Sequence, residues 1–224
     1  MKHLSMGRWA GILYLGIIVA GLSGEAALRM PLIDWADGAA TGGAIGAHVS
    51  LFRASMATDM AMAAMDVALA VVFYRLLRGV DEAAALMAMV FRLMQAALIA
   101  GGLMFLFAAL QAVEAGADPL PHLAQHAVGY DLGLFFFGIN SLIMAVLLPR
   151  AGVARGIGWG IALAGVVYLA GSVTRFLAPG WNAAMQPAYL IPVVAEVALM
   201  LWLLFGPRLR GDQPRKTQSR SSMS

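Results

Sequence analysis

Long blocks of apolar residues, nearly free of charge, alternate with short polar segments along the whole chain. A transmembrane helix needs about 20 mostly apolar residues, because the hydrocarbon core of a bilayer is about 30 Å thick. Six blocks meet this requirement, and Gly and Pro residues typical of turns stand between them. The pattern therefore predicts an all-α, polytopic membrane helix bundle with six transmembrane helices. We place these spans at about residues 9–28, 51–74, 83–113, 122–148, 154–177 and 187–205.

The composition agrees with a membrane protein and excludes several other classes. The 224 residues are 61% hydrophobic and 12% charged, whereas a soluble domain has about 45–50% apolar and about 25% charged residues. The mean hydropathy is +0.80. The chain has no cysteine, which excludes disulfides, thiolate metal sites and cysteine nucleophiles. The basic residues lie in loops and in a tail, so we expect lipid and not nucleic acid as the partner.

The distribution of charge predicts the orientation of the bundle. If both termini are cytoplasmic, the inner segments contain 11 of the 15 basic residues, as the positive-inside rule requires. This predicts an N-in/C-in protein of the cell inner (plasma) membrane. The first block lacks a clear cleavage site, so we expect a span and not a removed signal peptide. Residues 207–224 are basic and rich in Ser, Gln and Pro, which predicts a disordered cytoplasmic tail.

Charged side chains within the predicted spans are the first candidates for function, because a charge in hydrocarbon must be paired, neutralised or hydrated. Asp66 lies nine residues from Arg75 at one end of its span, and Arg92 lies ten residues from Glu82. At a rise of 1.5 Å per residue the two depths are about 14 and about 15 Å. We therefore expect an Asp66–Arg92 ion pair between neighbouring antiparallel helices, acting as a structural pair or as a gate.

Three further carboxylates then remain without a cation inside the predicted spans. Asp59, Asp131 and Glu196 all lie toward the outer half of the bundle, and we expect them to converge on one cavity. Arg53 and Arg175 stand nearer its mouth. Either an arginine reaches in, or a carboxyl is protonated, or a cation or basic ligand binds. This excess of acid predicts a site that binds a ligand or carries protons.

Three histidines leave open a metal or haem site. His122 and His126 are four residues apart and share one helix face, and His48 precedes the second span. The spacing suits a metal ion or haem, although the usual third ligand is not evident nearby. Interfacial histidines that only form hydrogen bonds are more common, so no cofactor is predicted. No recognisable catalytic motif is present either, and we lean against an enzyme.

Several short segments, in this order and spacing, resemble a known family. They run from the first span to the last: Arg8-x-x-Gly11-x-Leu13-Tyr14-Leu15, Ala40-Thr41, Leu51-Phe52-Arg53, Asp59 with Asp66, Phe91-Arg92-Leu93 with Gln95, Gly129-Tyr130-Asp131-x-Gly133-Leu134, Phe136-Phe137-Gly138, Gly165, Tyr168-Leu169, Phe176-Leu177-Ala178-Pro179, and Glu196 ahead of Leu201-Trp202-Leu203-Leu204. On these residues the chain resembles the bacterial membrane family called domain of unknown function 4386 (DUF4386). The resemblance implies a multi-pass membrane protein and implies no activity.

The leading hypothesis is a membrane protein that binds or conducts a small ligand, ion or proton through an acid-lined intramembrane cavity. Asp59, Asp131 and Glu196 would be its binding groups. One alternative is a non-transporting membrane partner or sensor whose polar pairs serve helix packing. A second alternative is a membrane protein that uses His48, His122 and His126 to hold a metal or haem. The sequence leaves open whether the chain forms a homo-oligomer.

Overall fold

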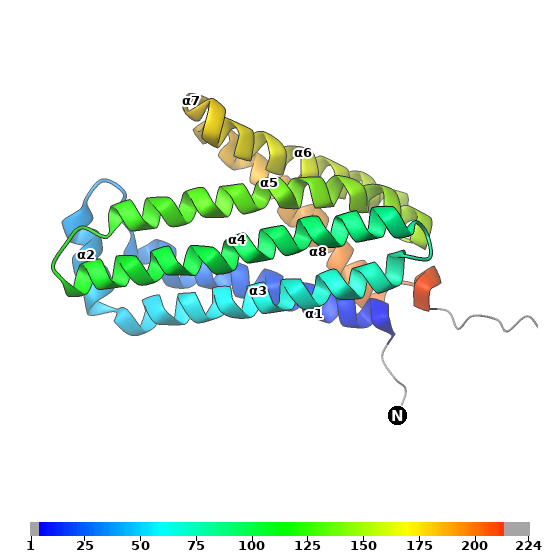
Figure 1. The fold of residues 1–224 in the computed structure, drawn as a ribbon, viewed down its shortest axis with the longest axis horizontal. Helices are drawn as coiled ribbons and strands as arrows, with labels where there is room; N and C mark the ends of the chain where they lie inside the picture. Colours follow the sequence, from blue (N-terminus) through cyan, green and yellow to red (C-terminus); the bar gives the residue numbers. More distant parts are fainter. Residues whose placement is uncertain (1–4, 213–224) are drawn as a thin grey trace, which may run out of the picture.

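The computed structural model describes residues 5–212, and all regular secondary structure in this range is helical. Six apolar helices are long enough to cross a membrane (Figure 1). The six predicted spans correspond to these six helices. Their ends differ by up to four residues, except that the last helix begins at Pro179, eight residues before the predicted start. The spans are Met6–Leu32, Val49–Leu77, Glu82–Glu114, Leu120–Ala151, Arg155–Leu177 and Pro179–Phe205.

Four of the spans are single α-helices, and the first and last are composite. The single helices are α3 (Val49–Leu77), α4 (Glu82–Glu114), α5 (Leu120–Ala151) and α6 (Arg155–Leu177). The first span begins as α1 (Met6–Leu22), widens into a π-helix, η1 (Ser23–Arg29), and ends in a 3₁₀ turn, η2 (Met30–Leu32). The last span consists of α7 (Pro179–Met185), η3 (Gln186–Tyr189) and α8 (Leu190–Phe205).

The six spans form a closed ring. Each span packs against the next one along the chain from α1 to α8, and α8 then packs back against α1. Both the beginning of α1 and the turn η4 (Arg210–Asp212) lie at the same end of the bundle (Figure 1). At the opposite end, α7 and the adjacent end of α6 diverge from α5.

Helix ends in the bundle carry the capping residues that the free backbone groups require. Asp81 caps α4 by accepting a hydrogen bond from the Ala84 backbone N–H at 3.0 Å, and an aspartate in this position satisfies one of the unpaired N–H groups. Gly152 ends α5 with φ of 111°, a left-handed conformation that favours glycine. The sharp turn after α5 therefore follows directly from the sequence.

Glycine lets α5 and α6 approach closely. A Cβ atom at Gly165 would lie 2.9 Å from the carbonyl oxygen of Gly138, and one at Gly138 would lie 3.0 Å from the carbonyl oxygen of Gly165. Helix association in lipid depends on such close van der Waals approach. This pair fixes the distance between α5 and α6, on which the cavity described below depends.

A short helix covers one end of the bundle. The segment between the first two spans contains α2 (Gly38–Ala47), which Asp37 caps by accepting a hydrogen bond from the Ala40 backbone N–H at 2.9 Å. Ile45 of α2 is fully buried and packs with Phe52 and Leu106 in a small apolar cluster. This cluster closes the end of the bundle between α3 and α4.

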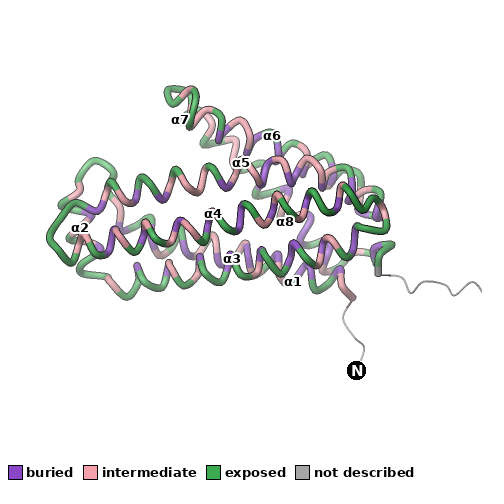
Figure 2. The backbone as a smooth tube through the Cα atoms, viewed as in Figure 1, coloured by how far each residue is buried: buried purple, intermediate pink, exposed green. Residues whose placement is uncertain are grey.

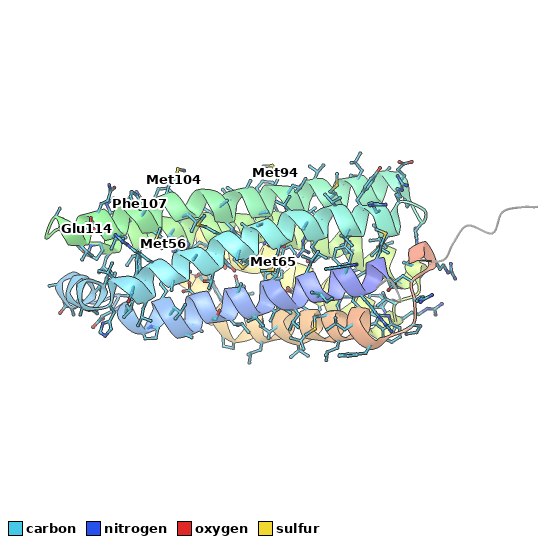
Figure 3. All side chains as sticks on the ribbon, turned by 90° about the horizontal axis from the view of Figure 1, so that it is seen from below. Met56, Met65, Met94, Met104, Phe107 and Glu114 are labelled. Atoms are coloured by element: carbon cyan, nitrogen blue, oxygen red, sulfur yellow. The ribbon has the colours of Figure 1, made fainter. Side chains whose placement is uncertain are left out.

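Large apolar side chains cover the outside of the bundle, as expected for a lipid-facing surface. Figure 2 shows that buried residues recur on one side of each long helix, while the opposite side is exposed. In Figure 3, Met94 and Met104 point outward from α4, and Met104 and Phe107 are 70% and 52% exposed. The described part of the chain is thus a membrane bundle with an apolar exterior.

The beginning of the predicted tail packs on the bundle. Leu209 is 2% exposed and belongs to the main apolar core, and Gly211 lies close to the backbone of Leu76 at the end of α3. Residues 207–212 thus contact the bundle. The rest of the predicted tail, residues 213–224, lies outside the described residues.

Candidate functional site

An ion pair between α3 and α4 lies deep within the bundle. Arg92 Nη2 donates to Asp66 Oδ1 at 2.6 Å, and Gln95 Nε2 donates to Asp66 Oδ2 at 3.3 Å. The side chains of Asp66 and Arg92 are 1% and 3% exposed. These are the two residues whose matched depths predicted an ion pair.

Aromatic rings surround the guanidinium group of Arg92. The ring centroids of Tyr14, Phe73 and Phe137 lie 5.3, 5.9 and 5.1 Å from Arg92 Cζ. A cation over the face of an aromatic ring is attracted by the quadrupole of the ring. Arg92 is therefore compensated twice, by the carboxylate of Asp66 and by three rings from three other helices.

A second buried ion pair joins η1 to α3. Arg29 Nη1 donates to Asp59 Oδ2 at 2.7 Å, and both side chains are almost fully buried. Arg29 also donates to Glu25, one turn earlier in the π-helix. The first span was expected to end at about residue 28, which left Arg29 outside it. In the structure the span continues to Leu32, and Arg29 faces inward.

Asp131 has a partner of its own on α6. Arg175 Nε lies 3.3 Å from Asp131 Oδ2, and both side chains are partly exposed. Ser172 Oγ donates to the backbone carbonyl of Asp131 at 2.7 Å. These two contacts join α5 to α6 near the end where α6 and α7 diverge from α5.

Glu196 on α8 differs from the other embedded acids because its described partner is not a cation. The Tyr168 hydroxyl donates to Glu196 Oε1 at 2.5 Å. Within residues 5–212, no Lys, Arg or His forms an ion pair with Glu196. Arg92 and Asp66 lie near enough to act on Glu196 electrostatically, with opposite signs.

The structure does not gather Asp59, Asp131 and Glu196 around one point. Arg29 pairs with Asp59 and Arg175 pairs with Asp131. Arg53, expected near the mouth, instead lies 3.6 Å from Glu114 in an exposed pair at the end of the bundle. The excess of acid in the spans is reduced to one carboxyl group, that of Glu196.

A cavity of about 420 Å³ lies inside the ring of helices, and we call it the central cavity. Each of the six spans contributes to its lining. Its walls are mainly apolar, with Ile18, Leu134 and Val197 among them. Its polar lining consists of Tyr14, Glu25, Asp66, Arg92, Gln95, Tyr130, Tyr168, Tyr189 and Glu196.

A second, more polar cavity of about 380 Å³ adjoins the central cavity, and we call it the rim cavity. The two share Glu25, Met30, Tyr130, Leu134 and Tyr189 in their linings. The rim cavity also contains both ion-paired arginines of this region, Arg29 and Arg175, together with His126 and Asp131. Together the two cavities extend from the buried Asp66–Arg92 pair toward the end where α7 diverges.

The three histidines are not arranged as a metal site. His126 is buried, and its Nε2 lies 3.9 Å from Asp59 Oδ2. His48 is exposed and its Nδ1 lies 3.1 Å from the Ala44 carbonyl oxygen, whereas His122 is partly exposed at the start of α5. In the part of the chain that the structure describes, no three His, Asp or Glu side chains form a group that could hold a metal ion. The metal alternative therefore lacks its ligand set.

Sequence reasoning missed the tyrosines of the central cavity. Four of the five tyrosines in the chain line it: Tyr14, Tyr130, Tyr168 and Tyr189. Tyrosine in membrane proteins is enriched at the two interfaces, but Tyr14, Tyr130 and Tyr168 lie inside predicted spans. Their position away from the predicted interfaces could have indicated, from the sequence alone, that these hydroxyl groups face a polar site inside the bundle.

Comparison with known proteins identifies the family and gives no further relative. A search of curated proteins found no match, and neither did a search of solved structures. The model of one protein family, described as "Domain of unknown function (DUF4386)", matches residues 9–206. That range includes all six spans, both buried ion pairs and the residues that line the central cavity. The chain belongs to the DUF4386 family.

Proposed function

We propose that this protein binds a small, mainly apolar molecule in the central cavity within the membrane. The observation that carries the proposal is the cavity itself, which combines apolar walls with a few polar groups at defined positions. Ligand sites have volumes of about 300–1,000 Å³ and the same mixture of lining. The central cavity, at about 420 Å³, has the size of such a site.

Two polar atoms at the cavity favour a ligand with hydrogen-bonding groups. Gln95 Oε1 and Arg92 Nε are buried and have no hydrogen-bond partner among residues 5–212. A buried polar atom without a partner costs about 1–3 kcal/mol. Both residues line the central cavity, but the two atoms themselves are covered by protein atoms, so a polar ligand would reach them only after a side chain of the lining moves.

The buried ion pairs support a structural role beside the binding function. Asp59 and Asp66 both lie on α3, and their partners Arg29 and Arg92 come from the two helices on either side of it. We infer that these pairs fix the register of three helices, and that the Asp66–Arg92 pair forms the floor of the site. Asp131 and Arg175, which line the rim cavity, would lie on the path to it.

We also infer the orientation and the membrane. The end of the bundle with both described terminal segments also carries Arg75, Arg78, Arg150 and Arg155, at the helix ends and in the turn after α3. The positive-inside rule assigns this end to the cytoplasm. The rim cavity would then face the outside of a bacterial inner membrane.

Binding of the neutral probe 4-phenylbutanol tests the proposed function. Equilibrium dialysis against the full chain in lipid nanodiscs, with empty nanodiscs as background, measures the amount bound. We expect saturable binding to the natural protein. Val197→Phe, which places a ring in the central cavity, should abolish it.

The matched control is Val166→Phe on α6. Val166 is 53% exposed on the outside of the bundle, so the same substitution leaves the cavity unchanged and binding should persist. Equal binding by the natural protein and by Val197→Phe, or none by either, would contradict the proposed function.

A further inference from the structure

The central cavity has an acidic group that no described basic side chain neutralises. Asp66 and Arg92 neutralise each other at 2.6 Å, which leaves Glu196 as the lining carboxyl group at depth without a cationic partner. Its described hydrogen bond comes from Tyr168. An ionised carboxylate in an apolar environment is strongly disfavoured unless a positive charge accompanies it.

The aromatic side chains that line the central cavity also favour a positively charged ligand. The Tyr168 ring lies 6.1 Å from the Tyr189 ring and 5.3 Å from the Phe137 ring, measured between centroids. Tyr130 lines the cavity as well. The faces of such rings carry negative potential and attract ammonium groups.

We propose that the ligand of the central cavity is a lipophilic organic cation, such as a protonated amine with an apolar body. This inference rests on the proposed binding function and names its ligand class. The ammonium group lies at Glu196, beside the rings of Tyr168 and Tyr189. The apolar body lies along the walls formed by Ile18 and Val197.

Other ligand classes fit the same residues less well. An anion would meet the carboxyl group of Glu196 and the negative faces of the rings, while Arg92 is already engaged by Asp66. An inorganic cation such as Ca²⁺ requires about 6–8 oxygen ligands, and the described residues contain no group of three His, Asp or Glu side chains suited to a metal. A neutral molecule requires Glu196 to be protonated, since an ionised carboxylate beside it stays uncompensated.

Three probes of one shape test the ligand class. They are 4-phenylbutylamine, 4-phenylbutanol and 4-phenylbutanoate, which at neutral pH are a cation, a neutral molecule and an anion. Binding to the full chain in nanodiscs is measured by equilibrium dialysis. We expect the amine to bind about tenfold or more tightly than the alcohol, because its charge is compensated only at Glu196. We expect the acid to bind more weakly than the alcohol.

Glu196→Gln should remove the preference for the amine and retain binding of the alcohol. The matched control is Glu114→Gln, since Glu114 is an exposed carboxylate at the end of the bundle and its loss should leave all three affinities unchanged. The comparison of the three probes with the natural protein needs no variant, so it remains decisive if Glu196→Gln does not fold.

Two results would overturn the proposal and are distinguishable from failure of the proposed function. If the amine and the alcohol bind equally, and Val197→Phe abolishes both, the cavity binds ligands but does not select cations. If the acid binds most tightly, the ligand class is wrong while the site remains. If no probe binds to the natural protein, this inference and the proposed function both fail.

Discussion

At the scale of single residues, α3 is held on both sides by buried arginines. Asp59 and Asp66 are seven residues apart and so lie on one face, about two turns from each other. Arg29 approaches Asp59 from η1, and Arg92 approaches Asp66 from α4. A buried pair contributes little net stability, but removal of one partner leaves an isolated charge in a poorly solvated site.

Asp66→Leu should therefore destabilise the bundle by about 3–5 kcal/mol, because Arg92 loses its carboxylate. The double variant Asp66→Leu/Arg92→Met should recover most of this loss, since no isolated charge remains. Unfolding in mixed micelles, followed by circular dichroism, measures the free energy of both. A double variant as unstable as Asp66→Leu alone would show that packing, and not the isolated charge, causes the loss.

The two ion pairs also show how far residue-level prediction from the sequence reaches. The Asp66–Arg92 pair follows from equal depths on two helices joined by a short turn. The Arg29–Asp59 pair does not, because Arg29 stands after the predicted end of the first span and only the π-helix turns it inward. Tyr168 as the donor to Glu196 was missed for another reason. The two residues lie on consecutive spans and are 28 apart, close to the 26 that separate Asp66 and Arg92, but a tyrosine is not among the charged side chains whose depths predict an ion pair.

At the scale of elements, the approach of α5 to α6 depends on Gly138 and Gly165. Each glycine faces the backbone carbonyl of the other, so a side chain on either one meets backbone as well as a neighbouring leucine, Leu169 at Gly138 and Leu142 at Gly165. The long apolar spans were predictable because length and hydropathy define them. The short helices α2 and α7 were not, since segments of 10 and 7 residues rich in Gly and Ala show no apolar periodicity.

Gly165→Ala should lower the melting temperature, because overpacking of a close contact costs about 1–3 kcal/mol. Gly156→Ala is the control on the same helix: a Cβ atom there meets nothing within 4 Å. Since alanine favours a helix over glycine by about 1 kcal/mol, that variant should be unchanged or slightly more stable. Equal melting temperatures for the two variants would exclude a contact between α5 and α6 at Gly165.

At the scale of the whole molecule, the central cavity exists only when the ring is closed. Each span contributes at least one polar residue to its lining, among them Tyr14, Asp66, Arg92, Tyr130, Tyr168 and Glu196. The last helix must therefore pack against the first before the site is complete. Because the number of spans is even, the beginning of the first span and the end of the last span lie on the same side of the membrane.

Because the chain has no cysteine, single cysteines report its orientation without background. We expect Ala117→Cys, in the exposed turn between α4 and α5, to react with a membrane-impermeant maleimide on intact cells. Gly79→Cys, in the exposed turn between α3 and α4, should react only after the cells are permeabilised. The opposite pattern would reverse the proposed orientation.

The wide turn of η1 decides which way the end of the first span faces. Residues Ser23–Arg29 follow π geometry between α1 and the 3₁₀ turn η2, and a π turn holds about one residue more than a turn of α-helix. Deletion of one residue from α1 would rotate the following residues by about 100° relative to the preceding ones, which would turn Arg29 away from Asp59. Deletion of one residue from η1 itself is absorbed by a return to ordinary α-helical winding, so Arg29 keeps its direction. A change of length should consequently be tolerated better in η1 than in α1.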